Sequence, residues 1–137
     1  MPEFYDEVIN NSPIKWNYQR FQPHAVVIDL AGNDFSAPLD SAEFVNRYLL
    51  FLQRIRNNYK NASIICLVGP SSANEKWEHW KNYIHAIVNE FGKTDNFIAY
   101  FEFSPFEPHG SDWHPNVLEH QKMADEFIPF LKNYMNW

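Results

Sequence analysis

The sequence predicts an α/β fold in which helices flank a parallel sheet. Three apolar runs rich in β-branched residues lie within residues 24–32, 62–69 and 96–103, and such runs are typical of strands covered on both faces. A segment with apolar residues at helical spacing follows each run. Alternation of this kind produces βαβ units with right-handed crossovers. We therefore expect three parallel strands in one sheet.

The elements are expected in the following order. Residues 2–24 are irregular, and the first strand covers His24 to Gly32. Ser41 is a candidate cap for a first helix that runs to about Tyr59, with an acidic residue in its first turn and basic residues near its end. Its apolar positions at helical spacing are Phe44, Val45, Tyr48, Leu49, Leu52 and Ile55.

The second and third helices follow the later strands. The second is expected over residues 74–91, because Gly92 is a typical residue at which helices stop. The third is expected over residues 116–133, where Pro129 favours a kink or an early end. The candidates for the inner face of this third helix are Val117, Leu118, Met123, Phe127, Ile128 and Leu131.

Composition bounds the classes of function. The 137 residues correspond to one domain or a part of one, and 45% hydrophobic with 20% charged residues is ordinary for a globular protein. The net charge of −6 argues against a nucleic-acid partner. The longest apolar runs are too short to span a bilayer, so no membrane span is expected. Cys66, the only cysteine, lies inside a strand-like apolar run and is read as a buried core residue.

Parallel sheets bind ligands beyond the carboxyl ends of their strands, and polar residues with chemical potential follow the first and third strands. Gly32 permits a tight turn after the first strand. Asn33 would then present a carboxamide N–H to a developing oxyanion. Alternatively, the Gly-Asn-Asp sequence forms only a turn whose side chains cap the backbone. The residues alone do not decide between these two interpretations.

His114 stands before a proline and a helix start, where a histidine is a candidate general base. A metal site built from His109, Asp112, His114 and His120 is the alternative, but the spacing of these residues does not favour it and no other ligand cluster is present. We therefore expect neither a metal nor another cofactor. Trp113 is either a platform that stacks on sugar or a packed ring.

Two segments carry a family resemblance. "AVVIDLAGNDFS" at 25–36 resembles the third conserved block of SGNH (GDSL-type) hydrolases, and "SDWHPN" at 111–116 with its following helix resembles the fifth. Their pairing, about 80 residues apart, is most similar to the family 2 carbohydrate esterases, which are acetyl xylan esterase-like enzymes. The resemblance covers nearly the whole chain. It implies a flavodoxin-like SGNH fold whose N-terminal strands are missing, so that residues 1–137 form a single partial domain.

The resemblance also implies roles for individual residues. His114 corresponds to the base that activates a serine and protonates the leaving alcohol, and Asn33 to the side-chain oxyanion donor beside Gly32. Gly32 and Trp113 would contact substrate. Many SGNH enzymes place an aspartate three residues before the histidine, but here that position is Ser111 and the acid is Asp112, two residues before. The role of Asp112, as a member of the catalytic group or a bystander, stays open.

The block that should hold the nucleophile does not occur in this sequence. None of its serines lies in a Gly-Asp-Ser context, and an acyl-enzyme route requires one activated hydroxyl. We expect the chain alone to be inactive, and the complete form to remove O-acetyl groups from xylan-like plant polysaccharide outside the cell. Two alternatives stay open: a catalytically inactive remnant or carbohydrate-binding module, and a lipid-ester or thioester hydrolase of the same superfamily. The expected partners are the acetylated saccharide and either the N-terminal half of the domain or a second copy of the chain.

Overall fold

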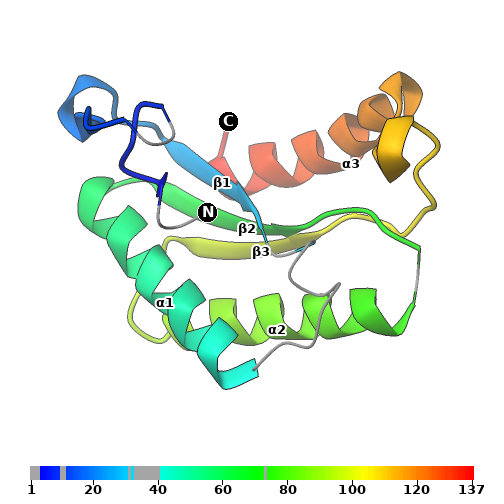
Figure 1. The fold of residues 1–137 in the computed structure, drawn as a ribbon, viewed down its shortest axis with the longest axis horizontal. Helices are drawn as coiled ribbons and strands as arrows, with labels where there is room; N and C mark the ends of the chain where they lie inside the picture. Colours follow the sequence, from blue (N-terminus) through cyan, green and yellow to red (C-terminus); the bar gives the residue numbers. More distant parts are fainter. Residues whose placement is uncertain (1–3, 10–11, 31, 33–40, 73) are drawn as a thin grey trace.

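The computed structural model describes residues 4–9, 12–30, 32, 41–72 and 74–137. Three strands alternate with three long helices, and two short 3-10 helices join them (Figure 1). The elements are η2 (Tyr18–Arg20), β1 (Ala25–Asp29), α1 (Ser41–Asn58), β2 (Ser63–Val68), α2 (Glu75–Phe91), β3 (Ile98–Glu102), η4 (Ser111–Trp113) and α3 (Val117–Met135). The predicted α/β class is therefore confirmed, and each strand is a few residues shorter than its apolar run.

The three strands form one parallel sheet in the order β1-β2-β3. Val26 of β1 lies opposite Ile64 of β2, and Ile64 lies opposite Ile98 of β3. Every residue of the central strand β2 is buried, which accounts for its uninterrupted apolar sequence. Cys66 lies in this strand with no exposed surface, and burial raises the pKa of its thiol to about 12. The thiol is thus a core group, as the sequence predicts.

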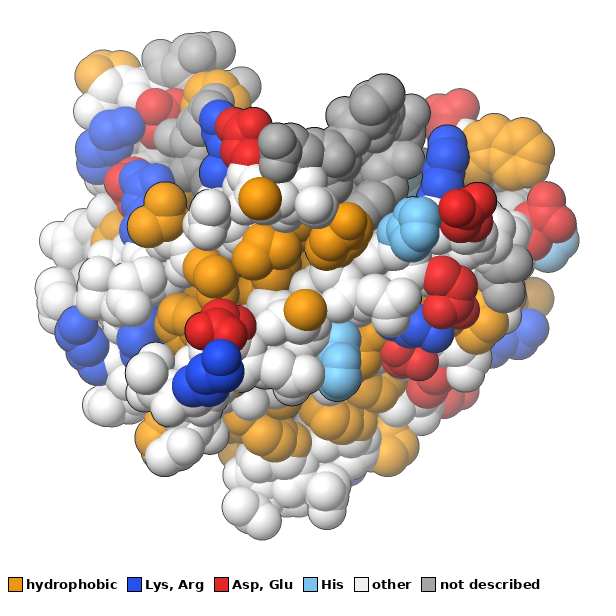
Figure 2. Space-filling view, turned by 90° about the horizontal axis from the view of Figure 1, so that it is seen from below, with side chains coloured by type: hydrophobic (Ala, Val, Ile, Leu, Met, Phe, Trp, Pro, Cys, Tyr) orange, Lys and Arg blue, Asp and Glu red, His pale blue; other side chains and the backbone are white. Residues whose placement is uncertain are grey.

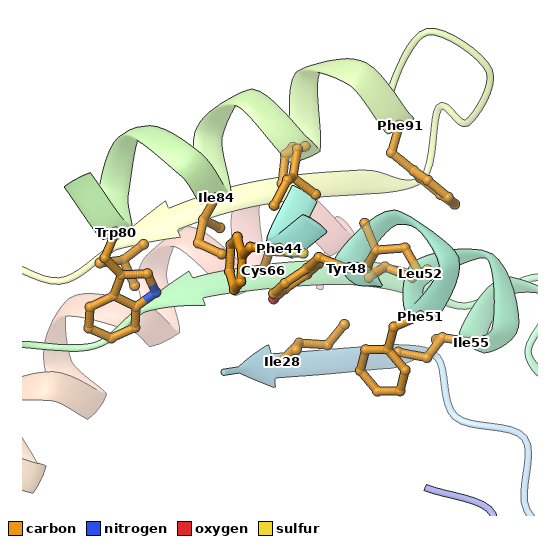
Figure 3. Close-up of a cluster of buried hydrophobic side chains, with 14 of the residues drawn as sticks. Ile28, Phe44, Tyr48, Phe51, Leu52, Ile55, Cys66, Trp80, Ile84 and Phe91 are labelled. Carbon is orange, nitrogen blue, oxygen red and sulfur yellow. The ribbon is translucent and has the colours of Figure 1, made fainter. Parts of the chain in front are cut away.

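Helices α1 and α2 cover one face of the sheet and α3 covers the other (Figure 1). The larger core lies between the sheet and the first two helices, where Leu52, Ile55 and Ile84 meet Ile28 and Cys66 (Figure 3). Most of the α1 positions predicted from helical spacing are buried, and Val45 and Leu49 are partly buried against the same cluster. α1 begins at Ser41 itself, so Ser41 is the first helical residue rather than the cap before it.

The inner face of α3 differs from the predicted one. Met123, Phe127 and Leu131 pack against the sheet as expected, but Phe130 and Tyr134 join them. The other three predicted positions are exposed, namely Val117 (84%), Leu118 (75%) and Ile128 (46%). These five partly buried residues follow an i, i+4, i+7, i+8, i+11 spacing, which is one continuous helical stripe. The predicted set mixed two faces of the same helix.

Pro129 does not end α3, which continues to Met135. A proline inside a helix removes one backbone hydrogen bond and leaves one carbonyl without its usual donor. Much of α3 is solvent-exposed, so water can reach the carbonyl that Pro129 leaves free. The helix then ends at Asn136, which adopts a left-handed conformation with φ of 56°.

The N-terminal segment is fastened to α1. The Tyr18 hydroxyl donates to Asp6 at 2.6 Å, Arg54 of α1 forms an ion pair with the same carboxylate, and the Tyr5 ring packs edge-on against Phe51.

The face seen from the side of α1 and α2 exposes hydrophobic side chains at its centre, with charged side chains toward its margins (Figure 2). Among the helices that the structure describes, none is both long and apolar enough to cross a membrane.

Candidate active site

A cavity of about 1200 Å³ opens at the carboxyl ends of the strands. This is the edge at which parallel sheets bind their ligands. Its walls come from the ends of β1 and β2, from α1, from the loop after β3 and from the start of α3. The residues that line it include Asp29, Leu30, Gly32, Arg47, Tyr48, Gly69, Ser71, Trp80, Pro108, Asp112, Trp113, His114 and His120.

The loop that carries His114 is tightly folded. The Gly110 amide donates to the His114 carbonyl at 2.8 Å, and the His114 amide donates to the Ser111 carbonyl at 3.0 Å. Asp112 and Trp113 both have positive φ angles, 50° and 60°. Gly110 is required here, because a Cβ at this position would lie 2.5 Å from the His114 carbonyl oxygen. The backbone is therefore fixed close to His114 on both sides.

Glu119 joins this loop to α3, and sequence reasoning missed it. Its buried carboxylate accepts from the backbone amides of Asn116 (2.8 Å) and His109 (3.1 Å), and lies 2.7 Å from His109 Nδ1. These donors, first the Asn116 amide, hold the pKa of the Glu119 carboxyl at about 2, so it is ionised at neutral pH. The Asn116 side chain accepts from the Glu119 amide at 3.0 Å, which completes a capping box. The Asn-x-x-Glu spacing was the signal for it in the sequence.

Two tryptophans of α2 support the strand ends beneath the cavity. Trp80 Nε1 donates to the Leu30 carbonyl at 3.2 Å, and Trp77 Nε1 donates to the Gly69 carbonyl at 3.2 Å. Both rings are buried and belong to the core, and Trp80 also lines the floor of the cavity. Gly32 lies over the Trp80 ring, and a Cβ there would be 3.5 Å from it. Asn33, the predicted oxyanion donor, lies outside the described residues.

Asp29 is a second group that sequence reasoning missed. It ends β1, and its carboxylate faces the cavity near Gly69. The side chain is exposed toward the cavity, yet the protein around it displaces enough water to raise the pKa of the carboxyl above its usual range. No sequence motif marks this residue. Only its position as the last residue of a strand, where ligands bind, pointed to it.

The structure brings four of the five predicted site residues to one cavity: Gly32, Asp112, Trp113 and His114. Trp113 is 78% exposed and is therefore available to a ligand. His120, on the first turns of α3, lines the same cavity as His114. Within the described part of the chain, no group of three or more His, Cys, Asp or Glu side chains is arranged to hold a metal ion.

The structure is a parallel α/β sheet with a cavity at its carboxyl edge and a histidine-bearing loop after its last strand. The model of the GDSL-like lipase/acylhydrolase family matches residues 4–127, and the chain belongs to that family. The predicted resemblance to SGNH-type enzymes is thereby confirmed.

Relatives with known roles are carbohydrate esterases. The chain is 31% identical to the cellulase/esterase CelE of Acetivibrio thermocellus, over 97% of the chain and 17% of that protein. It is 28% identical to an acetylxylan esterase / glucomannan deacetylase of Cellvibrio japonicus, over 100% of the chain and 38% of that protein. The chain therefore spans less than half of the length of each of these relatives.

Solved structures give the same result. A family two carbohydrate esterase from Clostridium thermocellum, determined in complex with cellohexaose, matches with a TM-score of 0.91 at 31% identity, covering 97% of the chain and 42% of that structure. The family two esterase from Cellvibrio japonicus matches with a TM-score of 0.88 at 28% identity, covering 99% and 41%. The fold described above thus corresponds to less than half of each of these longer esterase chains.

Proposed function

We propose that this chain is the base-bearing part of a carbohydrate esterase that removes O-acetyl groups from xylan-like plant polysaccharide outside the cell. The observation that carries the proposal is the placement of His114, Trp113 and Gly32 around one cavity at the carboxyl edge of the sheet. Acyl transfer through a serine uses a positioned base and donors for the oxyanion, and an exposed aromatic ring offers a face on which a sugar can stack.

In this proposal His114 accepts the proton of a serine hydroxyl as that oxygen attacks the acetyl carbonyl. His114 then returns the proton to the departing sugar hydroxyl. Asn33 donates to the oxyanion of the tetrahedral intermediate, and Trp113 stacks on the sugar ring. Water later attacks the acetyl-serine by the same base catalysis. Asp112, two residues before His114, is the candidate acid that orients the His114 imidazole. The other steps do not require a contact between Asp112 and this ring.

In this proposal the serine comes from outside residues 1–137, and the open β1 side of the sheet supports docking of its carrier there. Among the described residues, β1 has a strand neighbour on one side only. Val27, which points to the face opposite the main core, is 44% exposed, whereas Ala25 of the same strand packs into the cluster under α3. The open edge and face fit further parallel strands and a helix, that is, the N-terminal half of the same domain.

The test has two stages. The purified chain alone should not hydrolyse p-nitrophenyl acetate above a denatured control. Adding a segment that carries a Gly-Asp-Ser block and the N-terminal strands should restore hydrolysis of p-nitrophenyl acetate and release acetate from acetylated xylan. In that complex His114→Ala should abolish turnover, and Asn33→Ala should lower it by about 10²–10³-fold, the usual loss for one oxyanion donor. His79→Ala, on the exposed side of α2, is the matched control.

A binding-only role is the second candidate, and the exposed Trp113 ring favours it. Under that role the chain binds cello- or xylo-oligosaccharides and catalyses no reaction. Trp113→Ala should then weaken binding, whereas His114→Ala should leave binding unchanged. A preference for p-nitrophenyl palmitate over acetylated xylan in the reconstituted enzyme would instead indicate a lipid-ester hydrolase. Turnover by the chain alone that is lost on mutating one of its own serines would contradict the account of the nucleophile.

A further inference from the structure

Both ends of the loop that carries His114 are bonded to one carboxylate. His109 stands at the start of the loop and Asn116 at its end, and their backbone amides donate to the same Glu119 oxygen, at 3.1 and 2.8 Å. The other Glu119 oxygen lies 2.7 Å from His109 Nδ1. Three hydrogen-bonding groups therefore converge on the buried Glu119 side chain, which holds the two ends of the loop together.

The loop of residues 109–116, between these two anchored ends, is held in an unfavourable backbone conformation. Asp112 and Trp113 both adopt left-handed φ angles of 50° and 60°, which side-chain-bearing residues avoid unless the surroundings enforce them. Inside the loop the described backbone hydrogen bonds are Gly110 to His114 and His114 to Ser111. Two such bonds leave the loop dependent on an anchor at its ends.

We propose that Glu119 is a positioning residue that sets His114 and Trp113 against the cavity by clamping residues 109–116, in addition to its place in the helix cap. The chemical task of His114 and Trp113 at the cavity rests on the proposed function, whereas the clamp itself is a property of the fold. Glu119 does not line the cavity and does not touch substrate.

Substitutions separate clamping from helix capping. Glu119→Gln keeps the side-chain volume but removes the negative charge and replaces one acceptor oxygen by an NH₂ donor, so the charge-assisted hydrogen bonds from the His109 and Asn116 amides are lost. Asn116→Ala removes the side chain that caps α3 at the Glu119 amide, and leaves all three donors to the Glu119 carboxylate in place. Asp125→Asn, an exposed carboxylate on the same helix that accepts only from Gln121 among the described contacts, is the control.

The measurement is amide hydrogen exchange of peptides covering residues 108–117, followed by mass spectrometry on the full chain, which does not depend on esterase activity. In Glu119→Gln the Gly110 and His114 amides should exchange about tenfold faster or more, the scale expected for loss of hydrogen bonds to a charged group. Asn116→Ala and Asp125→Asn should leave these amides as in the unmodified chain. In the reconstituted enzyme Glu119→Gln should lower turnover while Asn116→Ala does not.

A second variant keeps the test decisive if Glu119→Gln does not fold. His109→Ala removes a side chain that is 71% exposed, so the core is untouched, and it deletes one of the three donors. It should speed exchange of the same two amides by a smaller factor. Equal exchange in Glu119→Gln and Asn116→Ala, or unchanged exchange in a folded Glu119→Gln and in His109→Ala, would overturn the clamp and leave Glu119 as a helix cap.

Discussion

At the scale of single residues, Glu119 and Asp29 are carboxyl groups whose surroundings shift their pKa values in opposite directions. Donors surround Glu119 and favour its charge, whereas protein displaces water around Asp29 and disfavours its charge. The loop beside the cavity therefore contains one carboxylate whose charge stabilises the fold, and the cavity itself contains one whose ionisation costs stability. The second is a pattern frequent at functional sites.

Glu119 should make the chain sensitive to acid. Its folded-state pKa of about 2 lies below the ordinary value of 4.5. The unfolded state therefore binds the proton more tightly, and the stabilisation is complete above about pH 4.5 and is lost as pH falls toward about 2. Urea unfolding midpoints at pH 6 and pH 3 measure this. In Glu119→Gln the fall between the two pH values should be smaller than in the parent or in Asp125→Asn, and an equal fall in all three would contradict the assignment.

Asp29 should behave in the opposite way. Because burial raises its folded pKa, the folded state binds the proton more tightly, and stability is lost as pH rises from the unfolded value of about 3.8 through the folded value. Asp29→Asn should raise the thermal midpoint at pH 7 and have a smaller effect at pH 3. A lower midpoint at pH 7 would mean that the ionised carboxylate has a stabilising partner.

At the scale of elements, α1 separates buried from exposed positions within two residues. Leu52 has no exposed surface and Leu50 is 71% exposed. Leu52→Ala should lower the free energy of unfolding by about 2–5 kcal/mol, the range for a leucine truncated in a packed core. Leu50→Ala should change it by less than about 0.5 kcal/mol. Comparable losses for the two variants would mean that α1 is turned differently on the sheet.

The helices also show what the sequence can and cannot predict. Periodicity located α1, α2 and α3 because burial of one face imposes a 3.6-residue repeat. It failed to choose the inner face of α3, since Val117 and Leu118 are as apolar as the residues that pack and only tertiary contact separates them. Strand ends predicted the location of the cavity. The contacts of Glu119 with His109 could not be predicted, because they depend on how the loop returns to the helix.

At the scale of the whole molecule, the sheet is open on the β1 side. In the described ranges, β1 has one strand neighbour, and its Val27 is 44% exposed on the face of the sheet that α3 covers only in part. An apolar strand edge of this kind recruits another strand. Under the proposed function an N-terminal half of the domain covers this edge, and in the isolated chain a second copy is the available partner.

The isolated chain should therefore self-associate, and the association should depend on β1. Sedimentation velocity over a range of concentrations should show dimers or larger species for the parent chain. Val27→Lys places a charge on the open face and should shift the distribution toward monomer, as charged side chains do on natural edge strands. Leu50→Ala, which alters an exposed leucine on the opposite layer, should not. In the reconstituted enzyme Val27→Lys should also weaken docking of the N-terminal segment. Esterase activity should therefore fall when that segment is limiting and recover when it is saturating. A parent chain that stays monomeric and unfolds cooperatively would show that the β1 side needs no covering partner.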